Sequence, residues 1–528
     1  MINGNQIGPA GDLLRTDQLD LRGQQTMTDE PGSNAPENAS GTTHDAGSRR
    51  WRSVWRIHFY AGMFSIPFLL LMAVTGLVIL YTTPIQKATE GNVRTVTPAG
   101  ERVSYDAQEQ AVEAAYPDET VVSMQTPADS GSSTIFGFDS GHQAYVDPYT
   151  GKVLGDNDPG RGIVGLANRL HGFLNNDQRM ISLPAVSALW DGGPVMRDYV
   201  IGDLVLEILG VWTLVLAITG VFLWWPRRSR YGGAEKTGRR WFAIRMGKKG
   251  RAKWRDLHAV PGVLLSALFA LTIVSGLGWS TYWGPNFTAL ANEISPNVWP
   301  DAPSSGQVTR ADFDVLGNQI TWNTGDIPIP NSYAAATDGT QPVPLSLDAV
   351  ATIAEREQMK PGYYVFFPVN DVDEAGNPVY GTFDLSNNWP RKTGEARNVA
   401  IDQFTGATLQ DLNAYGLGTV SYGMDVLVST HMGTQLGIVS RIFMTLLCLL
   451  TIWSIISGLV MFWKRRRKGT LGLPRRPMSV RLGKQLTIAA VALGIVFPQW
   501  GVTALIVLGI DRFVIRSVPR LRTAFGQR

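Results

Sequence analysis

Four apolar blocks, each long enough to cross a bilayer as a helix, constrain the fold of this chain more than any other feature. They cover Phe59–Tyr81, Ile201–Trp225, Val260–Trp283 and Leu436–Trp463. A helix needs about 20 mostly apolar residues to cross the hydrocarbon core of a membrane, and a run of that length is rare in a soluble core. The sequence therefore predicts a polytopic α-helical membrane protein whose first partner is the lipid bilayer.

Two weaker apolar blocks follow near the C-terminus, at Leu482–Phe497 and Gly501–Ile515. The residues between them, Pro498, Gln499 and Trp500, are suited to a tight turn. We expect two further spanning helices here, which makes about six in all. The alternative is one kinked or re-entrant pair.

Lysine and arginine are distributed unevenly along the chain, although its formal net charge is only +3. They crowd at Arg49–Arg56, Arg227–Arg255 and Lys464–Lys484, and again in the C-terminal tail. Such clusters mark the cytoplasmic side of a membrane protein. We therefore expect both termini in the cytoplasm and a multi-pass protein of the inner (plasma) membrane. The long loops 82–200 and 284–435 would lie outside, and no nucleic-acid partner is expected.

These patterns divide the chain into alternating membrane and aqueous segments. The first residues are polar, show no apolar periodicity and are predicted to be disordered rather than a signal peptide. The predicted segments are a disordered cytoplasmic tail (1–48), the first span (49–82), an outer domain (83–200), the second span (201–226), a basic cytoplasmic loop (227–256), the third span (257–284), a second outer domain (285–434), the fourth span (435–463), a basic cytoplasmic loop (464–480), a two-helix hairpin (481–517) and a cytoplasmic tail (518–528).

The two halves of the chain resemble each other. Each outer loop has a helix-like stretch, then alternating strands, and ends in a strand, an Asp-x-aromatic-Thr-Gly turn and a strand, at Tyr145–Leu154 and Val399–Leu409. Glycine supplies the special dihedral angles of such a hairpin. The spans repeat as well, because His58, Gly62 and Thr75-Gly76 have the same spacing as His258, Gly262 and Ser275-Gly276. The second and fourth spans also end alike, from Thr219-Gly220 and Ser457-Gly458. We infer a duplication, with two outer α+β domains.

Histidine carries the chemistry that this sequence suggests. There are six histidines; we assign no role to His44 in the tail, and place His142 in a surface turn. The other four stand at duplicated positions, since His58 and His258 begin the first and third spans, while His171 and His431 precede the second and fourth. One histidine near a membrane surface is often only an interfacial polar group, but four at repeated positions favour a shared function.

We predict that this function is the binding of haem, because imidazole is a strong axial ligand for haem iron. Gly62 and Gly262 lie four residues after a histidine, on the same helix face, where the missing side chain would let a porphyrin approach; alternatively, they allow close helix contact. From His58 to Gly76 is 18 residues, or roughly 27 Å of helix. One iron therefore cannot join His58 to His171. We predict His58 with His258 at one b-type haem and His171 with His431 at another.

Other cofactor classes are excluded or unsupported by the motifs. Cys448 is the single cysteine, which excludes an internal disulfide and a cysteine zinc cluster, and no Cys-x-x-Cys-His motif for c-type haem occurs. We find neither a dinucleotide fingerprint nor a P-loop, so electrons must come from a quinol or a separate reductase. Glu207 lies inside the second apolar block and is a functional candidate, although it could equally pair with a neighbouring helix. Asp203 is expected near the outer surface.

These residues together resemble the PepSY-associated transmembrane proteins, also called iron-regulated membrane proteins. The resemblance covers nearly everything after residue 49, and the matching stretches are Tyr145–Gly151, Gly202–Glu207, Trp224–Arg227, Trp254–Gly262, Thr430–Gly433 and Phe462–Arg465. Similar members include di-haem reductases of ferric siderophores, which implies b-type haem, iron acquisition and an outer-facing ferric substrate. One departure is that His171 precedes its span by about 30 residues. The segment Leu174–Asp198 must therefore fold back.

We expect a membrane oxidoreductase that passes electrons outward to a ferric siderophore or another ferric chelate, that is, a ferric-siderophore reductase. A second interpretation is a binding or regulatory protein, whose PepSY domains hold a peptidase or a metal chelate without redox chemistry. A third is a transporter. Both halves start on the same side of the membrane, however, so the inverted repeat of many transporters is not supported.

Overall fold

The computed structural model describes residues 39–176, 178–189, 192–225, 244, 246–247, 249–299, 308–313, 324–325, 327–333, 343–387, 389–466, 470–473 and 484–526. Residues 49–528 form one compact unit. Most of the two basic loops, 227–256 and 464–480, lies outside the described residues. Helix α1 covers Ala39–Leu80, so residues 39–48, predicted to be disordered, are helical. Extending a helix that is already formed costs far less than starting one, which lets α1 continue into this polar segment.

Five helices among the described residues are long and apolar enough to span a membrane. They are Arg50–Leu80 of α1, α6 (Ile201–Trp224), α7 (Arg251–Leu277), α11 (Ile438–Arg465) and Pro498–Ile515, which joins α13 (Pro498–Gly509) to a π-helical turn. The described part of α12 (Lys484–Val496) has 13 residues, or roughly 20 Å against a hydrocarbon core of about 30 Å. Among the residues that the structure describes, the expectation of about six spanning helices is therefore corrected to five spans and one short apolar helix.

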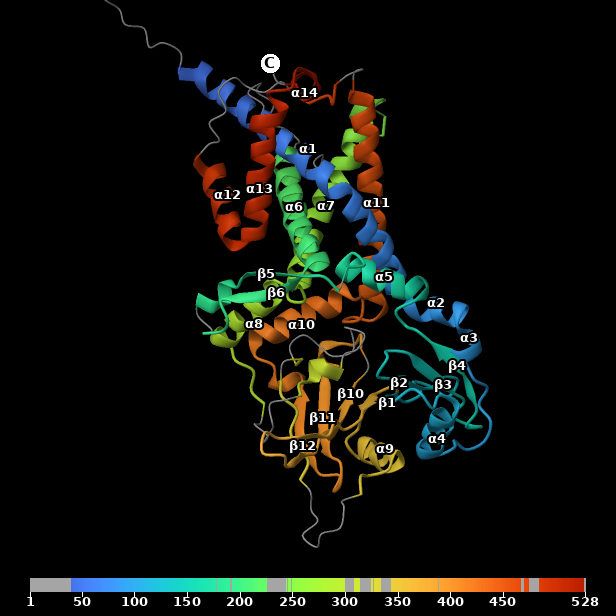
Figure 1. Ribbon diagram of the computed structural model, residues 1–528. Coiled ribbons are helices and arrows are strands. Elements are labelled where there is room, and N and C mark those ends of the chain that lie inside the picture. Colours follow the sequence, from blue (N-terminus) through green and yellow to red (C-terminus); the bar gives the residue numbers. More distant parts are fainter. Residues whose placement is uncertain are drawn as a thin grey trace, which may run out of the picture. The chain divides into compact units, whose positions relative to one another are not determined.

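The spanning helices pack side by side (Figure 1). Leu265 of α7 packs with Met444 and Leu447 of α11, and a second cluster joins Ala61 of α1 and Val211 of α6 to the α12–α13 hairpin. Helices α1 and α7 end where α6 and α11 begin, so both long loops leave the bundle at one end. We call this the sheet end, and the opposite end, where the Arg465 guanidinium lies over the ring of Trp55, the basic end.

The two long loops build a single antiparallel sheet rather than two separate sheets. Its strand order is β12-β11-β10-β7-β1-β2-β3-β4. The strands are β1 (Val121–Gln125), β2 (Thr134–Phe138), β3 (Gln143–Val146), β4 (Val153–Asn157), β7 (Tyr364–Phe366), β10 (Thr382–Ser386), β11 (Arg397–Asp402) and β12 (Thr408–Asn413). Strands β1 and β7 join the loops, with Ser123 opposite Phe366. Each would otherwise leave an unpaired edge, and pairing the two edges satisfies their backbone groups. The outer segment is therefore one module, where two domains were expected.

Two helices, α4 (Tyr105–Ala115) and α9 (Leu347–Arg356), pack on one face of this sheet. Their buried side chains share a core with both halves of the sheet, including Val112, Val350 and Phe136. Each helix also caps the other. The carboxylate of Asp106 accepts a hydrogen bond from the Leu347 backbone N–H at 2.7 Å, and Asp348 accepts one from the Tyr105 N–H at 2.8 Å. This exchange satisfies N-terminal donors of both helices and ties the two halves together.

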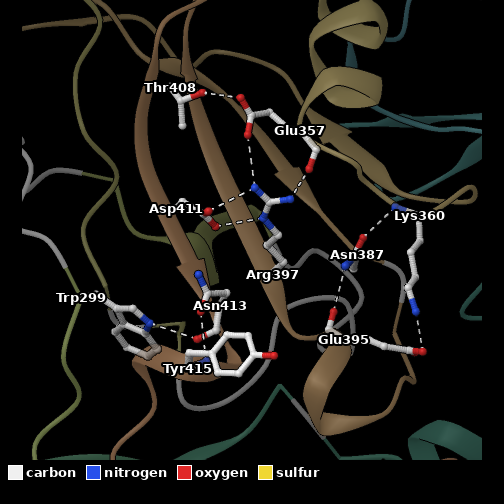
Figure 2. Close-up of polar contacts among 10 residues, drawn as sticks. All are labelled: Trp299, Glu357, Lys360, Asn387, Glu395, Arg397, Thr408, Asp411, Asn413 and Tyr415. Atoms are coloured by element: carbon white, nitrogen blue, oxygen red, sulfur yellow. Dashed lines mark hydrogen bonds and ion pairs between the residues drawn. The ribbon is translucent and has the colours of Figure 1, made fainter.

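Charged side chains fix the outer edge of the sheet (Figure 2). Arg397 of β11 donates from Nε and Nη2 to both carboxylate oxygens of Asp411 on β12, at 3.0 and 3.1 Å. It also donates to Glu357, which follows α9, at 3.2 Å. The fork of a guanidinium suits such a two-point contact, so Arg397 links the edge strands to the helix that covers them.

A layer of short elements lies between the bundle and the sheet (Figure 1). It contains α2 (Thr82–Thr89), α3 (Gly91–Arg94), α5 (Gly162–Phe173), the hairpin of β5 (Met180–Pro184) and β6 (Met196–Val200), α8 (Trp283–Ile294) and α10 (Thr419–His431). Of these, α5 and α10 carry His171 and His431 to the sheet end of the bundle. A two-stranded sheet of β8 (Asp371–Val372) and β9 (Pro378–Val379) and the C-terminal helix α14 (Pro519–Ala524) complete the described strands and α-helices.

Candidate functional site

Four of the six histidines lie in two pairs. His58 of α1 faces His258 of α7, with ring centroids 6.5 Å apart and planes inclined by 75°. His171 of α5 faces His431 of α10 at 6.4 Å, with the same inclination. From His58 to Thr75, which contacts His171, α1 advances 17 residues, or roughly 26 Å. The pairs are therefore at opposite ends of the bundle, in the combination expected from depth alone.

At the basic end, the ring of His58 is held through its Nδ1 atom. This atom lies 3.0 Å from the carbonyl oxygen of Leu216 and 3.1 Å from the hydroxyl of Thr219. A carbonyl can only accept, and the Thr219 hydroxyl already donates to the Val215 carbonyl at 2.7 Å. Nδ1 must therefore carry the proton, which leaves the lone pair of Nε2 free to bind a metal.

His258 repeats this arrangement in the second half of the chain. Its Nδ1 lies 3.1 Å from the Ser454 carbonyl oxygen and 3.2 Å from the Ser457 hydroxyl. That hydroxyl also donates to the Ser454 carbonyl, at 3.0 Å. The ring of His258 therefore also carries its proton on Nδ1, and the two rings of the basic-end pair present the same tautomer to each other.

At the sheet end, hydroxyl groups of the spans hold the two histidines. Thr75 Oγ1 lies 2.8 Å from His171 Nδ1, and Ser275 Oγ lies 2.8 Å from His431 Nδ1. Thr75 donates its own proton to the Leu71 carbonyl at 2.8 Å, so it must accept from the ring. Burial lowers the pKa of His171 to about 4, and His431 adds a smaller repulsion. Both effects keep the imidazole neutral, as metal binding requires.

A glycine follows each of these hydroxyl residues, and three of the four glycines touch a ring. A side-chain carbon at Gly220 would lie 3.2 Å from Cε1 of His58, and one at Gly76 or Gly458 would lie 3.4 Å from Cε1 of His171 or His258. The hydroxyl therefore holds the ring and the glycine makes room for it. The repeated Thr-Gly and Ser-Gly dipeptides are visible in the sequence, but their role was missed.

The expected glycines Gly62 and Gly262 lie elsewhere. A side-chain carbon at Gly62 would touch Cδ1 of Leu216 at 3.4 Å, and one at Gly262 would meet no described atom within 4 Å. Neither glycine packs against a histidine ring. Their role as contacts of a porphyrin stays a prediction.

The fold-back of the segment Leu174–Asp198 has a clear structural basis. Strands β5 and β6 pair in register, with Met180 opposite Val200, so this segment leaves α5 and returns directly to the start of α6. There, a side-chain carbon at Gly202 would lie 1.7 Å from the Phe173 carbonyl oxygen. Only glycine permits this approach, which brings His171 to the sheet end despite its distance from the span in sequence.

Glu207 has a structural explanation. Its Oε1 accepts from the backbone N–H groups of Tyr282 and Trp283, each at 2.9 Å, and its Oε2 accepts from Gln499 at 2.7 Å. The carboxylate thus caps α8 and ties α6 to the α12–α13 hairpin. Asp203, expected near the outer surface of the membrane, lies in the first turn of α6 at the sheet end, where its side chain is buried and accepts from the Thr281 N–H at 2.5 Å.

The two remaining histidines, His142 and His44, belong to neither pair. His142 lines a cavity of about 350 Å³ in the outer module, together with Asp312, Phe313 and Phe366. The side chain of His44 lies outside the described residues. Among the described residues, no group of three or more histidine, cysteine or acidic side chains could hold a bare metal ion, so each candidate site consists of two histidines.

The spacing of the two rings in each pair can be compared with the spacing that one haem iron between them would need. A histidine nitrogen lies about 2 Å from a bound transition metal and roughly 1 Å from its own ring centre, so two rings on opposite sides of one metal have centroids roughly 6 Å apart. The observed separations are 6.5 and 6.4 Å. The ring separations and the bonded Nδ1 atoms therefore suit two sites at which a metal could lie between two histidines.

Comparison with known proteins supplies the family. The family model of the PepSY-associated TM region matches residues 55–465, a stretch that contains all four paired histidines. A search of curated proteins finds no match. Because the matched stretch covers well over half of the sequence, the chain belongs to the PepSY-associated transmembrane family.

Proposed function

We propose that this chain is a membrane oxidoreductase that binds two b-type haems and passes electrons across the bilayer to a ferric chelate. The observation that carries the proposal is the presence of a histidine pair at each end of one helical bundle, with Nδ1 bonded in all four rings. His58 and His258 would hold one haem, and His171 and His431 the other. Haem, when bound, supplies a reversible one-electron Fe(III)/Fe(II) couple.

The chain's own residues provide what such sites need. Bonded Nδ1 atoms fix the tautomer and the orientation of each ring and raise its basicity as a ligand. Apolar clusters around Val211 and Leu265 lie within the spans, and an apolar environment is typical of haem in membranes. The chain has no motif for a nucleotide, so we assign the electron donor to a quinol or a separate reductase.

Orientation follows from the basic residues of the bundle. The positive-inside rule places the basic end in the cytoplasm and the sheet end outside an inner (plasma) membrane. Cysteine labelling with an impermeant thiol reagent tests this after Cys448, which is buried, has been replaced. We expect Tyr415→Cys, at a position that is 96% exposed, to react from outside. Lys249→Cys at the basic end should react only after permeabilisation, and the reverse pattern would overturn the orientation.

The acceptor proposed here is a ferric siderophore. Siderophores hold ferric iron tightly and ferrous iron much less tightly, so a one-electron reduction would release the metal. The resemblance to di-haem siderophore reductases supports this substrate class, and the sheet end places the second histidine pair beside the outer module.

Two measurements on the purified full chain test the proposal. A pyridine haemochrome assay should give about two haems per chain, and a ratio near zero from haem-replete cells would remove the redox function. Pre-reduced protein in liposomes should then reoxidise faster when a ferric siderophore is added outside. If no ferric chelate accelerates reoxidation over buffer, the siderophore reductase assignment is wrong.

A second candidate function is binding without redox chemistry. The cavity of about 350 Å³ in the outer module, lined by Phe313, Phe366 and His142, favours a role in holding a metal chelate or a segment of a peptidase. A colourless preparation that binds such a ligand would favour this function over the first.

A further inference from the structure

The four histidines are not held equally. At the basic end, Nδ1 of His58 and of His258 each has two acceptors, a backbone carbonyl and a hydroxyl. At the sheet end, the Thr272 carbonyl lies beside the ring of His431 in addition to the Ser275 hydroxyl. His171 differs, because among the described residues the hydroxyl of Thr75 is the one group that Nδ1 bonds.

The Thr75 hydroxyl has the right geometry to act alone. Its proton is directed to the Leu71 carbonyl at 2.8 Å, which leaves its lone pair for the His171 ring, also at 2.8 Å. Thr75 is buried, with 5% of its surface exposed, so water cannot readily replace its hydroxyl. The adjacent Gly76 backs Cε1 of the same ring. Two neighbouring residues of α1 therefore determine how a histidine from α5 is oriented.

We propose that Thr75 is the positioning residue on which the ligand function of His171 depends. Its counterpart at the basic end, Thr219, shares this task, because Nδ1 of His58 also contacts the Leu216 carbonyl. The proposal rests on the proposed di-haem function and deepens it. Without Thr75, Nδ1 of His171 has no acceptor among the described residues, and the ring is free to change tautomer. Without Thr219, the Leu216 carbonyl still holds the proton of His58 on Nδ1.

This difference predicts unequal effects of matched substitutions. Valine has nearly the shape of threonine without the hydroxyl. Loss of the partner of a metal-bound histidine typically lowers metal affinity or activity about 10- to 100-fold. We expect Thr75→Val to weaken haem binding at the sheet end by roughly that factor and to raise the potential of the residual haem there. We expect Thr219→Val to change the basic-end site much less. Thr75→Ser should behave as wild type, since serine performs this role at Ser275 and Ser457.

The experiment uses the full chain in nanodiscs, with haem content and potentiometric titration followed by visible spectroscopy. The expected result is selective loss or positive shift of one haem in Thr75→Val, rescue in Thr75→Ser, and retention in Thr219→Val. Equal effects of the two valine variants, or an unchanged Thr75→Val protein, would refute the proposal.

A second readout does not require haem. Nitrogen NMR of ¹⁵N-histidine-labelled, haem-free protein in lipid reports which ring nitrogen carries the proton, with the His171 signal assigned from a His171→Ala sample. Wild type and Thr75→Ser should show the proton on Nδ1, and Thr75→Val should not. An Nδ1 proton that persists in Thr75→Val would show that another group positions the ring. A wild-type protein without haem would end the di-haem function, while this spectrum would still decide the role of Thr75.

Discussion

Gly202 offers the sharpest test of how His171 reaches the bundle. An alanine there would place its Cβ 1.7 Å from the Phe173 carbonyl oxygen, 2.6 Å from the Phe173 carbonyl carbon and 2.9 Å from the Asn176 oxygen. All three atoms belong to the backbone, which cannot rotate away as a side chain can. The end of α5 must therefore retreat by roughly 1.5 Å or more to restore ordinary contact distances.

The expected cost follows from two opposing effects. Overpacking a tight site costs about 1–3 kcal/mol, and a backbone clash belongs at the upper end of that range. Alanine recovers about 1 kcal/mol relative to glycine inside a helix. The net loss of about 2 kcal/mol corresponds to a roughly 30-fold fall in the population with α5 docked. His171, two residues before Phe173, leaves its place with it.

The assay compares Gly202→Ala with Gly210→Ala on the same helix. A side-chain carbon at Gly210 would meet Cγ2 of Ile273 at 3.7 Å, an ordinary contact. We expect Gly202→Ala to lose the sheet-end haem, to keep the basic-end haem, and to be cleaved faster by trypsin after Arg169 of α5. Gly210→Ala should match wild type in all three. Equal haem content and equal cleavage in both variants would refute the docking of α5 described here.

Three further predictions concern other parts of the chain. His258→Ala should remove the basic-end haem and His431→Ala the sheet-end haem, as two separable losses in a redox titration; equal loss of both centres in each folded variant would contradict the pairing. Arg310→Met should destabilise the outer module by about 3–5 kcal/mol in thermal unfolding, because it strands Asp384, whose ion pair with Arg310 is 3.0 Å long and fully buried. Burial, with Glu113 as a smaller cause, raises the pKa of Glu109 to about 7. The folded module therefore loses stability as pH rises from about 4.5 to 7, and Glu109→Gln should remove this loss. If the wild type and the variant show the same dependence of unfolding on pH, Glu109 is not the group responsible.

The membrane architecture could be predicted because it depends on composition over about 20 residues at a time. The four long apolar blocks became α1, α6, α7 and α11; the boundaries of α6 and α11 agree within two residues, whereas the spans of α1 and α7 begin nine residues earlier than predicted, at Arg50 and Arg251. The C-terminal hairpin was harder, because the described part of α12 is apolar but short. The length of a helix decides whether it spans a bilayer, and the turn residues at Pro498 mark where α12 ends without showing how long the helix is.

The outer segment shows where local patterns fail. Strand, turn and helix signals repeat in both loops, and from them we predicted two separate outer domains. They could not show that β1 pairs with β7. The backbone groups along the edge of a strand are the same in both loops, so the sequence does not reveal which loop supplies the neighbouring strand. Likewise, Asp106 and Asp348 look like ordinary first-turn acids in sequence, yet each caps the other helix.

By itself, the sequence determined that the chain crosses a membrane and that His58 with His258, and His171 with His431, have matching depths, because helical rise converts residue number directly into distance. Only the tertiary structure decided how the rings are held. Hydroxyl residues such as Thr75 and Thr219 lie 96 and 161 positions from the histidines that they contact. Hydrogen bonds of this kind depend on how helices pack, and packing brings together residues that no local spacing relates.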